Sequence, residues 1–293
     1  MLKRLLLSLL LISLLLTACD NTGGTIMPPP PPPPGRAELS VVFLDVGQGD
    51  SILIHAPNGQ VMLIDGGRSI DLANRVILPQ IKDWGASQVD VLVVTHPDAD
   101  HISGLVGVLE TFPVKLAALT GDQHATQIYE RLLTNIRDKN IKALQVRTGT
   151  AIPFDPAVKL EVLGPDDEFV DRDNTNDGSI VIKLTYGQTS FLLTGDAESA
   201  ENQSILRRNA DVRSTVLKLG HHGSRSSTDE NWLRAVQPQL GIISAGAGNS
   251  YGHPHPEVIA ALNNLGIQYI RTDEHGTITI TSDGSQLRVT SQR

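Results

Sequence analysis

The chain has 293 residues and a formal net charge of −8; about 19% of its residues are charged and 40% are hydrophobic. This is the composition of an ordinary globular protein, long enough for one large domain or two small ones. The acidic balance counts against a protein that binds nucleic acid through a basic coat. It leaves open an enzyme that holds phosphate through metal ions.

The first residues are predicted to be a leader that is not part of the fold. Lys3 and Arg4 precede a Leu/Ile-rich run over residues 5–16, which has signal-peptide length and is too short to span a bilayer. Residues 16–19 read Leu-Thr-Ala-Cys and resemble the lipobox of bacterial lipoproteins. We therefore predict a lipoprotein signal peptide over residues 1–18 and a lipid on Cys19, the only cysteine. A plain secretory signal with an incidental cysteine is the alternative.

Residues 19–36 are predicted to be a linker, because they contain seven consecutive prolines, Pro28 to Pro34. Such a run favours polyproline II and forms a semi-rigid spacer of roughly 22 Å. A proline-rich ligand for the groove of another protein is the alternative. The expected location is outside the cell or in the periplasm, with the lipid on Cys19 as the membrane anchor.

From residue 37 onward, short strands alternate with helical patterns. Strands are predicted over residues 39–45, 51–57 and 60–67, the last two joined by a turn at Pro57-Asn58-Gly59-Gln60. The elements expected next are, in order, a helix over 71–84, a buried strand over 89–96, a helix after His101, a strand over 114–120 and a helix over 123–139.

The second half of the chain repeats this order. Residues 179–196 match residues 51–67, since Ser-Ile-x-Ile opens both segments and an aspartate beside glycine ends both, Asp196 and Asp65. Two similar β-rich halves predict two sheets packed face to face with helices outside, which is an αββα sandwich forming one α/β domain over residues 37–293. Asp65, Asp196 and the histidines at 96, 221 and 222 all follow strands, so they are expected to meet at one edge.

The segment THPDADHISG, residues 95–104, carries four potential metal ligands after a buried strand. In an extended loop side chains alternate, so His96 and Asp98 can point one way, while Asp100 and His101 enter a helix and point elsewhere. One loop can then supply two ligands to each of two cations, an arrangement suited to phosphoester hydrolysis.

Six segments, in order, resemble the metallo-β-lactamase fold and, more closely, the hydrolase domain of the ComEC family of competence proteins: FLDVGQGDS, THPDADHISG, NDGSIVI, LLTGDAE, LKLGHHGSRSS and YGHPHPEV. The resemblance implies two divalent cations, Mn²⁺ or Zn²⁺. The ligands it implies are His96 and Asp98 for one cation, Asp100, His101 and His221 for the other, and Asp196 as the bridge. His222 would lie beside the ligands or face phosphate, and which of the two adjacent histidines binds metal stays open.

Supporting residues follow from the same resemblance. Asp65 is expected to orient a ligand histidine. Asp98 stands where most enzymes of the fold have histidine, and no histidine occurs between His124 and His221. Both departures favour harder cations such as manganese over zinc. Ser179 or Asp177 would fill the vacant position, directly or through water.

Near the C-terminus, residues 246–262 place Asn249, His253 and His255 on a loop before a helix expected from Pro256. The resemblance implies that this loop closes over the site, where His253 would hydrogen-bond a scissile phosphate or protonate a leaving oxygen. The predicted catalytic residues are Asp100, His222 and His253. The sequence leaves open whether Asp50 lies near the metals or only follows a strand in a glycine turn. The arginines at 68, 225 and 234 either guide phosphate or belong to the solvated surface.

These residues predict a dinuclear, metal-dependent hydrolase that acts as a phosphodiesterase or nuclease on extracellular DNA. The DNA substrate is implied by the resemblance and not by composition. The alternatives are another ester hydrolase of the cell envelope, such as a phosphocholine-type esterase or lactonase, and a module that captures DNA without cutting it. The oligomeric state stays open.

Overall fold

The computed structural model describes residues 38–293. The predicted signal peptide, Cys19 and the proline run lie outside these residues, so what the sequence indicates about them remains prediction. Within the described part of the chain, no helix combines the length and the apolar character needed to cross a membrane.

One sheet has eight strands in the order β14-β13-β1-β2-β3-β4-β5-β6. Its strands are β1 (Leu39–Phe43), β2 (Ile52–His55), β3 (Val61–Ile64), β4 (Val91–Val93), β5 (Leu116–Leu119), β6 (Lys142–Gln145), β13 (Ile278–Ser282) and β14 (Leu287–Ser291). Strands β3 to β6 run parallel, whereas the other neighbours are antiparallel. The predicted turn between β2 and β3 is present, with the Gly59 N–H donating to the Ala56 carbonyl at 2.9 Å.

The other sheet has six strands in the order β12-β11-β10-β9-β8-β7. Its strands are β7 (Lys159–Gly164), β8 (Val181–Tyr186), β9 (Thr189–Leu193), β10 (Val216–Lys218), β11 (Leu240–Ile243) and β12 (Gln268–Arg271). An antiparallel hairpin, β8–β9, leads into the parallel strands β10 to β12, as β2–β3 leads into β4 to β6 in the first sheet. The repeat read from residues 51–67 and 179–196 is therefore a structural repeat.

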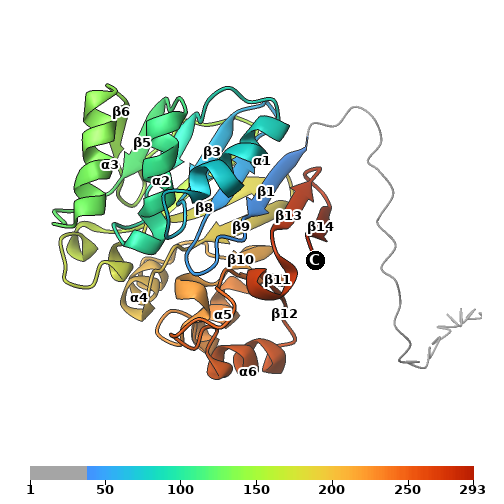
Figure 1. The fold of residues 1–293 in the computed structure, drawn as a ribbon. Coiled ribbons are helices and arrows are strands. Elements are labelled where there is room, and N and C mark those ends of the chain that lie inside the picture. Colours follow the sequence, from blue (N-terminus) through green and yellow to red (C-terminus); the bar gives the residue numbers. More distant parts are fainter. Residues whose placement is uncertain (1–37) are drawn as a thin grey trace, which may run out of the picture. The chain divides into compact units, whose positions relative to one another are not determined.

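Helices cover the outer faces of both sheets (Figure 1). The first sheet carries α1 (Leu78–Asp83), α2 (Ala99–Thr111) and α3 (Gln127–Asp138), and the second carries α4 (Ser199–Arg207), α5 (Glu230–Val236) and α6 (Pro256–Asn264). A single helical turn, α7 (Thr272–His275), precedes β13. The predicted helix over 71–84 is divided: a π-helical turn at Ala73–Ile77 runs into α1, which begins one residue before Pro79.

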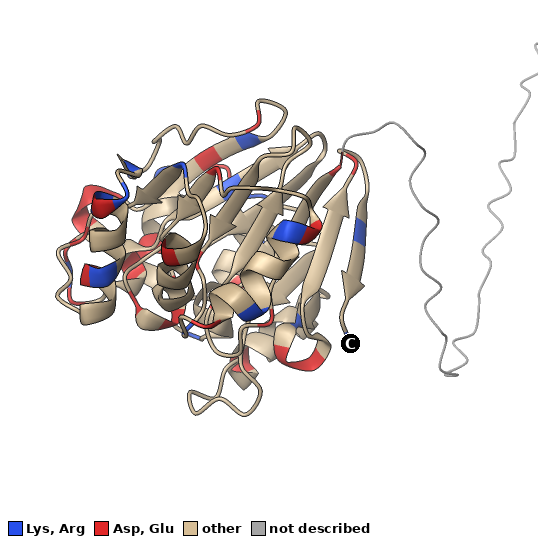
Figure 2. Ribbon diagram, turned by 45° about the horizontal axis from the view of Figure 1, so that its top comes forward, with Lys and Arg blue, Asp and Glu red and all other residues tan. Residues whose placement is uncertain are grey.

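Alternation along the strands explains the layers. In β1, Leu39, Val41 and Phe43 belong to the apolar core between the sheets, whereas Val42 belongs to the core under the helices. Successive side chains of a strand point to opposite faces, so a strand that is apolar throughout is buried on both. In Figure 2 the strands are mostly tan, with charged residues mainly on helices, loops and outer strands. The predicted αββα sandwich is confirmed.

Candidate metal centre

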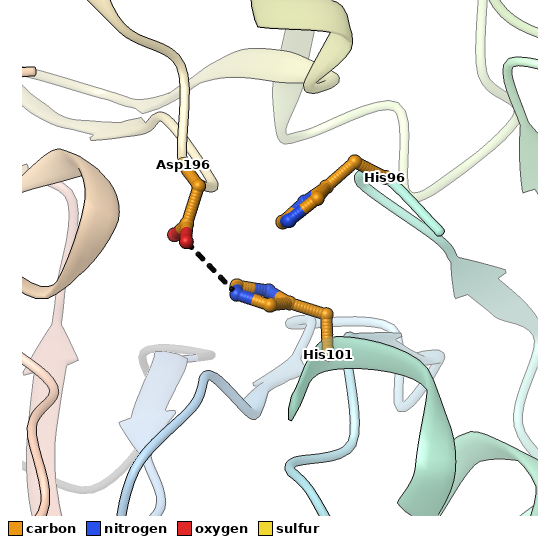
Figure 3. Close-up of side chains that lie close together, drawn as sticks. All are labelled: His96, His101 and Asp196. Atoms are coloured by element: carbon orange, nitrogen blue, oxygen red, sulfur yellow. Dashed lines mark ion pairs between the residues drawn. The ribbon is translucent and has the colours of Figure 1, made fainter. Parts of the chain in front are cut away.

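Four parallel strands, two in each sheet, are followed by an acid or a histidine, and these side chains meet at one edge of the two sheets. Asp65 and His96 come after β3 and β4 of the first sheet, while Asp196 and His222 come after β9 and β10 of the second. The carboxyl ends of neighbouring parallel strands lie at the same edge, which is where α/β folds place their sites. Figure 3 shows His96, His101 and Asp196 directed toward one another from separate segments.

Asp65 fixes the orientation of the His101 ring. Its Oδ2 accepts hydrogen bonds from His101 Nδ1 at 2.8 Å and from the Thr95 hydroxyl at 2.6 Å, and its Oδ1 accepts from the Thr95 N–H at 3.0 Å. Because Nδ1 is used as the donor, His101 Nε2 is left facing Asp196 Oδ2, 3.2 Å away. A carboxylate behind an imidazole in this way sets the tautomer that presents Nε2 to a cation.

The buried charges of the cluster support one another. Burial lowers the pKa of His101 and of His222, but the neighbouring carboxylates, Asp196 above all, raise both pKa values well above their ordinary range. Burial alone would raise the pKa of Asp196, yet the charges of His101 and His222 hold it well below the ordinary value. Asp196 therefore stays ionised, while His101 and His222 hold protons that a bound cation can displace.

Several buried atoms of the cluster make no hydrogen bond within residues 38–293. They are His96 Nε2, His101 Nε2, His222 Nε2 and Asp196 Oδ1. Two overlapping ligand sets, in each of which the donor atoms lie within 4.8 Å of one another, are His96, His101 and Asp196, and Asp100, His101 and His222. Unpaired buried imidazole nitrogens beside carboxylates are the donor set that divalent transition metals prefer, so the residues fit such ions.

The structure places His222, and not His221, among the ligand atoms of the second set. His222 Nε2 lies 3.5 Å from Asp100 Oδ2 and 3.4 Å from Asp196 Oδ2, and its Nδ1 donates to the Ser244 carbonyl at 3.0 Å. His221 Nε2 is 3.9 Å from Asp196, and its Nδ1 lies 3.0 Å from Glu198 Oε1. Both histidines adopt left-handed φ values, 47° and 56°, so the chain turns sharply after β10 and the second ring reaches the cluster. By position, the ring of His222, and not that of His221, joins the other donor atoms of the cluster.

Asp98 lies at the rim of the site. It is the residue before α2, its side chain is 38% exposed, and its Oδ2 is 3.8 Å from His96 Nε2. Its Oδ1 accepts a hydrogen bond from the Thr175 hydroxyl at 2.7 Å. Asp100 enters the first turn of α2, where burial raises its pKa, but His222 and His101 together lower that pKa below the ordinary value.

Ser179 and Asp177, the two residues expected to fill the vacant ligand position, have different surroundings. Ser179 Oγ accepts from the Asp196 N–H at 3.1 Å and lies 3.4 Å from His96 Nδ1, so it supports two residues of the cluster from behind. Asp177 Oδ1 accepts from the Glu201 N–H at the start of α4, so this carboxylate is directed to the helix. Only Ser179 contacts the residues expected to bind metal.

Asn249 and His253 are brought together on the loop before α6. Asn249 Oδ1 accepts from the His253 N–H at 3.0 Å, and its side-chain amide donates to the His253 carbonyl at 2.6 Å. The His253 ring centroid is 5.2 Å from that of His221 and 6.1 Å from that of His222. Burial, with the nearby charges of these two histidines, lowers the pKa of His253 to about 4. The ring is therefore neutral near pH 7.

Three further residues of the site were missed or left open by sequence reasoning. Asp50, in the VGQGDS segment, is buried 3.4 Å from His222 Nδ1 and forms an ion pair with Lys218. Glu198 holds His221, and the hydrogen bond from His221 lowers the pKa of Glu198 to about 2. The LLTGDAE and LKLGHH segments contain Glu198 and Lys218, but a lone charge after or within a strand carries no signal of its partner.

His255, Arg225 and Arg234 contact residues outside the cluster. His255 Nδ1 accepts from the Arg225 N–H at 3.1 Å, which ties the turn together. Arg225 pairs with Glu257 and Arg234 with Glu230, both on exposed surface. Neither arginine is therefore free to guide phosphate.

Comparison with known proteins identifies relatives over most of the chain. A family model described as the metallo-beta-lactamase superfamily matches residues 44–247. ComE operon protein 3 of Bacillus subtilis (strain 168) is 32% identical over 257 residues, which cover 83% of this chain and 33% of that protein. Recombination protein 2 of Haemophilus influenzae is 31% identical over 253 residues, covering 85% of this chain and 30% of that protein. The chain thus spans about a third of the length of these relatives.

A solved structure shares the fold at much lower sequence identity. CmlA, a diiron beta-hydroxylase from Streptomyces venezuelae, matches with a TM-score of 0.53 and 12% identity, covering 85% of this chain and 55% of its own. At this identity the likeness concerns the arrangement of sheets and helices.

Proposed function

The chain belongs to the metallo-β-lactamase superfamily, whose members are generally metallo-hydrolases, and we propose that it is a dinuclear phosphodiesterase that cleaves DNA outside the cell. The observation that carries the proposal is the convergence of His96, His101, His222 and Asp196, with unpaired buried donor atoms, at one edge of the sandwich. A donor set of this kind, supplied by two sheets, supports metal-assisted hydrolysis more directly than a binding role.

The ligands are assigned by position. His96, Asp98 and Asp196 would hold one cation, and Asp100, His101, His222 and Asp196 the other. When bound, the two cations supply Lewis acidity and neutralise the charge that develops on phosphate. Asp98 in place of a nitrogen ligand favours manganese over zinc in this assignment.

The chain's own residues orient and protect this centre. Asp65 holds the His101 ring, and Ser179 supports His96 and the backbone of Asp196. His253 is neutral near pH 7 because burial and the neighbouring histidines lower its pKa to about 4. A neutral imidazole is suited to hydrogen-bonding a phosphate oxygen, and this role is favoured over that of a proton donor to the leaving oxygen.

The DNA substrate rests on the relatives. Recombination protein 2, at 31% identity, and Competence protein ComA of Neisseria gonorrhoeae, at 29%, have names that refer to recombination and to competence, both of which concern DNA. Export and lipid attachment at Cys19 rest on residues 1–36, which precede the described domain. The domain would then act on DNA at the outer side of the membrane that holds the lipid.

Cleavage of linear and circular DNA by the purified chain lacking residues 1–18, with Cys19→Ser, tests the proposal. We expect cleavage with Mn²⁺, none with chelator, and loss in Asp196→Ala. Asp173→Ala, which removes an exposed aspartate, is the matched control. Metal binding without cleavage of any DNA would rule out the nuclease and direct attention to small phosphodiesters and lactones.

A further inference from the structure

A groove of about 450 Å³ lies beside the candidate metal centre, between the loop of Gly47 and Gln48 and the loop over residues 246–251, with Arg68 in its wall. Apart from Ala247 and Tyr251, the residues that line it are polar or glycine. None of the predicted metal ligands lines this groove. It therefore offers a ligand contacts other than those of the metals.

Arg68 presents an unpaired positive charge to the groove. Its side chain is exposed, and within residues 38–293 it makes no ion pair or hydrogen bond, unlike Arg225 and Arg234. The chain carries a net charge of −8, and Lys and Arg are scattered over the ribbon in the view of Figure 2. A free guanidinium on an acidic protein is well placed to contact a phosphate, which it can bind with two parallel hydrogen bonds.

The backbone beside Arg68 is fixed to the metal centre. The Gly67 N–H donates to the Asp50 carbonyl at 2.8 Å, and the Gly66 N–H donates to the His101 carbonyl at 2.6 Å. A Cβ on Gly66 would lie 2.4 Å from the backbone nitrogen of Leu105, so only glycine permits this approach to α2. The backbone that carries Arg68 is therefore held rigidly next to His101.

Tyr251 places an exposed aromatic ring on the other wall. Its exposed fraction is 62%, against 38% for Leu133, the other large hydrophobic residue that is exposed in the described part of the chain. The ring is stacked toward His253, with centroids 5.8 Å apart and an angle of 22° between the planes. Exposed aromatic rings in a polar groove are the platforms on which proteins stack nucleobases.

Hydrogen bonds hold the two walls in place. Asn249 Oδ1 accepts from the Tyr251 N–H at 3.2 Å and from the His253 N–H at 3.0 Å, so one side chain sets both positions. The Gly246 N–H donates to Gln48 Oε1 at 3.2 Å, and a Cβ on Gly246 would lie 2.7 Å from the Gln48 nitrogen. The two loops are therefore in contact, and the groove is preformed.

We propose that this groove binds one nucleotide of the DNA strand next to the scissile phosphate, with Arg68 on a neighbouring phosphate and Tyr251 stacked on a base. The proposal rests on the proposed function and deepens it, because it names the contacts that select a nucleic acid over a small ester. Stacking accepts any base, so the subsite predicts cleavage with little sequence preference.

Selectivity between two chromogenic esters tests the subsite. Thymidine 5′-(4-nitrophenyl) phosphate carries a base and sugar, whereas methyl 4-nitrophenyl phosphate carries neither. In Tyr251→Ala we expect the ratio of kcat/KM for the thymidine ester over the methyl ester to fall about tenfold, the size expected for one stacked base. Tyr251→Phe, which keeps the ring, should restore the ratio. An unchanged ratio in Tyr251→Ala would overturn the stacking contact.

A binding measurement separates the subsite from catalysis. Fluorescence anisotropy of a labelled single-stranded phosphorothioate oligothymidylate, which resists cleavage, with the metal-loaded full chain should give a Kd raised about fivefold or more by Arg68→Ala and by Tyr251→Ala. Arg234→Ala, which removes an arginine paired on the surface of α5, is the matched control and should leave the Kd unchanged.

The two measurements fail independently. If the wild type hydrolyses neither ester nor DNA, the proposed function is wrong, whereas weaker oligonucleotide binding by both variants still supports the subsite. If DNA is cleaved and neither variant changes the Kd or the ester ratio, the function stands and the subsite is overturned.

Discussion

Lys218 and Asp50 form an ion pair in the interior, with Lys218 Nζ 2.6 Å from Asp50 Oδ2 and the two side chains 0% and 1% exposed. Lys218 Nζ also donates to the Leu219 carbonyl at 2.9 Å. Burial alone would raise the pKa of Asp50, but Lys218 and His222 together lower it below the ordinary value. Lys218 therefore keeps an ionised carboxylate beside His222.

Breaking this pair from one side should be costly. Lys218→Met leaves Asp50 buried without its cation, so we expect the free energy of unfolding to fall by about 3–5 kcal/mol, measured by urea denaturation. Adding Asp50→Asn should recover much of the loss because the uncompensated charge is gone. Lys159→Met, which removes an exposed pair with Glu161, should cost less than about 1 kcal/mol. If Lys218→Met were as stable as the wild type, the ion pair would not contribute this free energy of unfolding.

The adjacent histidines should differ in metal binding. His222→Ala removes a buried Nε2 that faces Asp100 and Asp196, so we expect the bound metal to fall from two equivalents to one, measured by elemental analysis after dialysis. His221→Ala should retain both equivalents with affinity reduced by at most about 10- to 100-fold, the range for a residue behind the ligands. Loss of metal in His221→Ala with retention in His222→Ala would reverse the assignment.

Asp98 should influence the choice of metal. Asp98→His replaces an oxygen donor at the rim with an imidazole, so we expect the competition between Zn²⁺ and Mn²⁺ to move toward Zn²⁺. The measurement is the metal ratio bound from an equimolar mixture, compared between the wild type and the variant. An unchanged ratio would mean that Asp98 does not touch a cation.

A buried glutamate away from the ligands should make stability depend on pH. Burial, with the charges of Asp177 and Asp166, raises the pKa of Glu201 well above the ordinary value of 4.5. The native state then holds a proton that the unfolded chain has lost, so this contribution to stability is full below about pH 4.5 and decreases as the pH rises toward the native pKa.

Glu201→Gln should remove this dependence. We expect the variant to be more stable than the wild type at pH 8, by about 1–3 kcal/mol, and to lose this advantage near pH 4.5. Urea unfolding at the two pH values measures the difference, with Glu168→Gln at an exposed position as the control. An advantage of the same size at both pH values would exclude ionisation of Glu201 as its cause.

The elements with strong local signals were predictable from the sequence. Strands β1 to β5 and β8 to β11 are apolar runs ended by glycine, proline or an acid, and the match between residues 51–67 and 179–196 indicated that they form two similar sheets. The edge strand β6 was missed because residues 142–145 read KALQ and are largely exposed, without the alternation of a half-buried strand.

The C-terminal hairpin shows what a linear reading cannot give. Strands β13 and β14 complete the first sheet, where β13 pairs with β1 from the other end of the domain. The pairing of β13 with β14 is local, but β13 carries no signal of its other partner, β1, because pairing across more than 200 residues is decided by the packed sheets. The same limit applies to the site: His221 and His222 are adjacent and chemically equal, and only the left-handed turn after β10 determines which ring faces the acids.

The cluster at the edge of the sandwich has a consequence for how the domain comes apart. His101 and Asp196 lie about a hundred residues apart in the chain, and a cation held by both would join the two sheets as a cross-link. A covalent link closing a loop of this length is worth about 4 to 5 kcal/mol. Residues 38–293 contain no cysteine, so no disulfide can serve this purpose there. The resistance of the domain to unfolding would accordingly follow the supply of free metal, and a chelator would weaken the scaffold as it stops the chemistry.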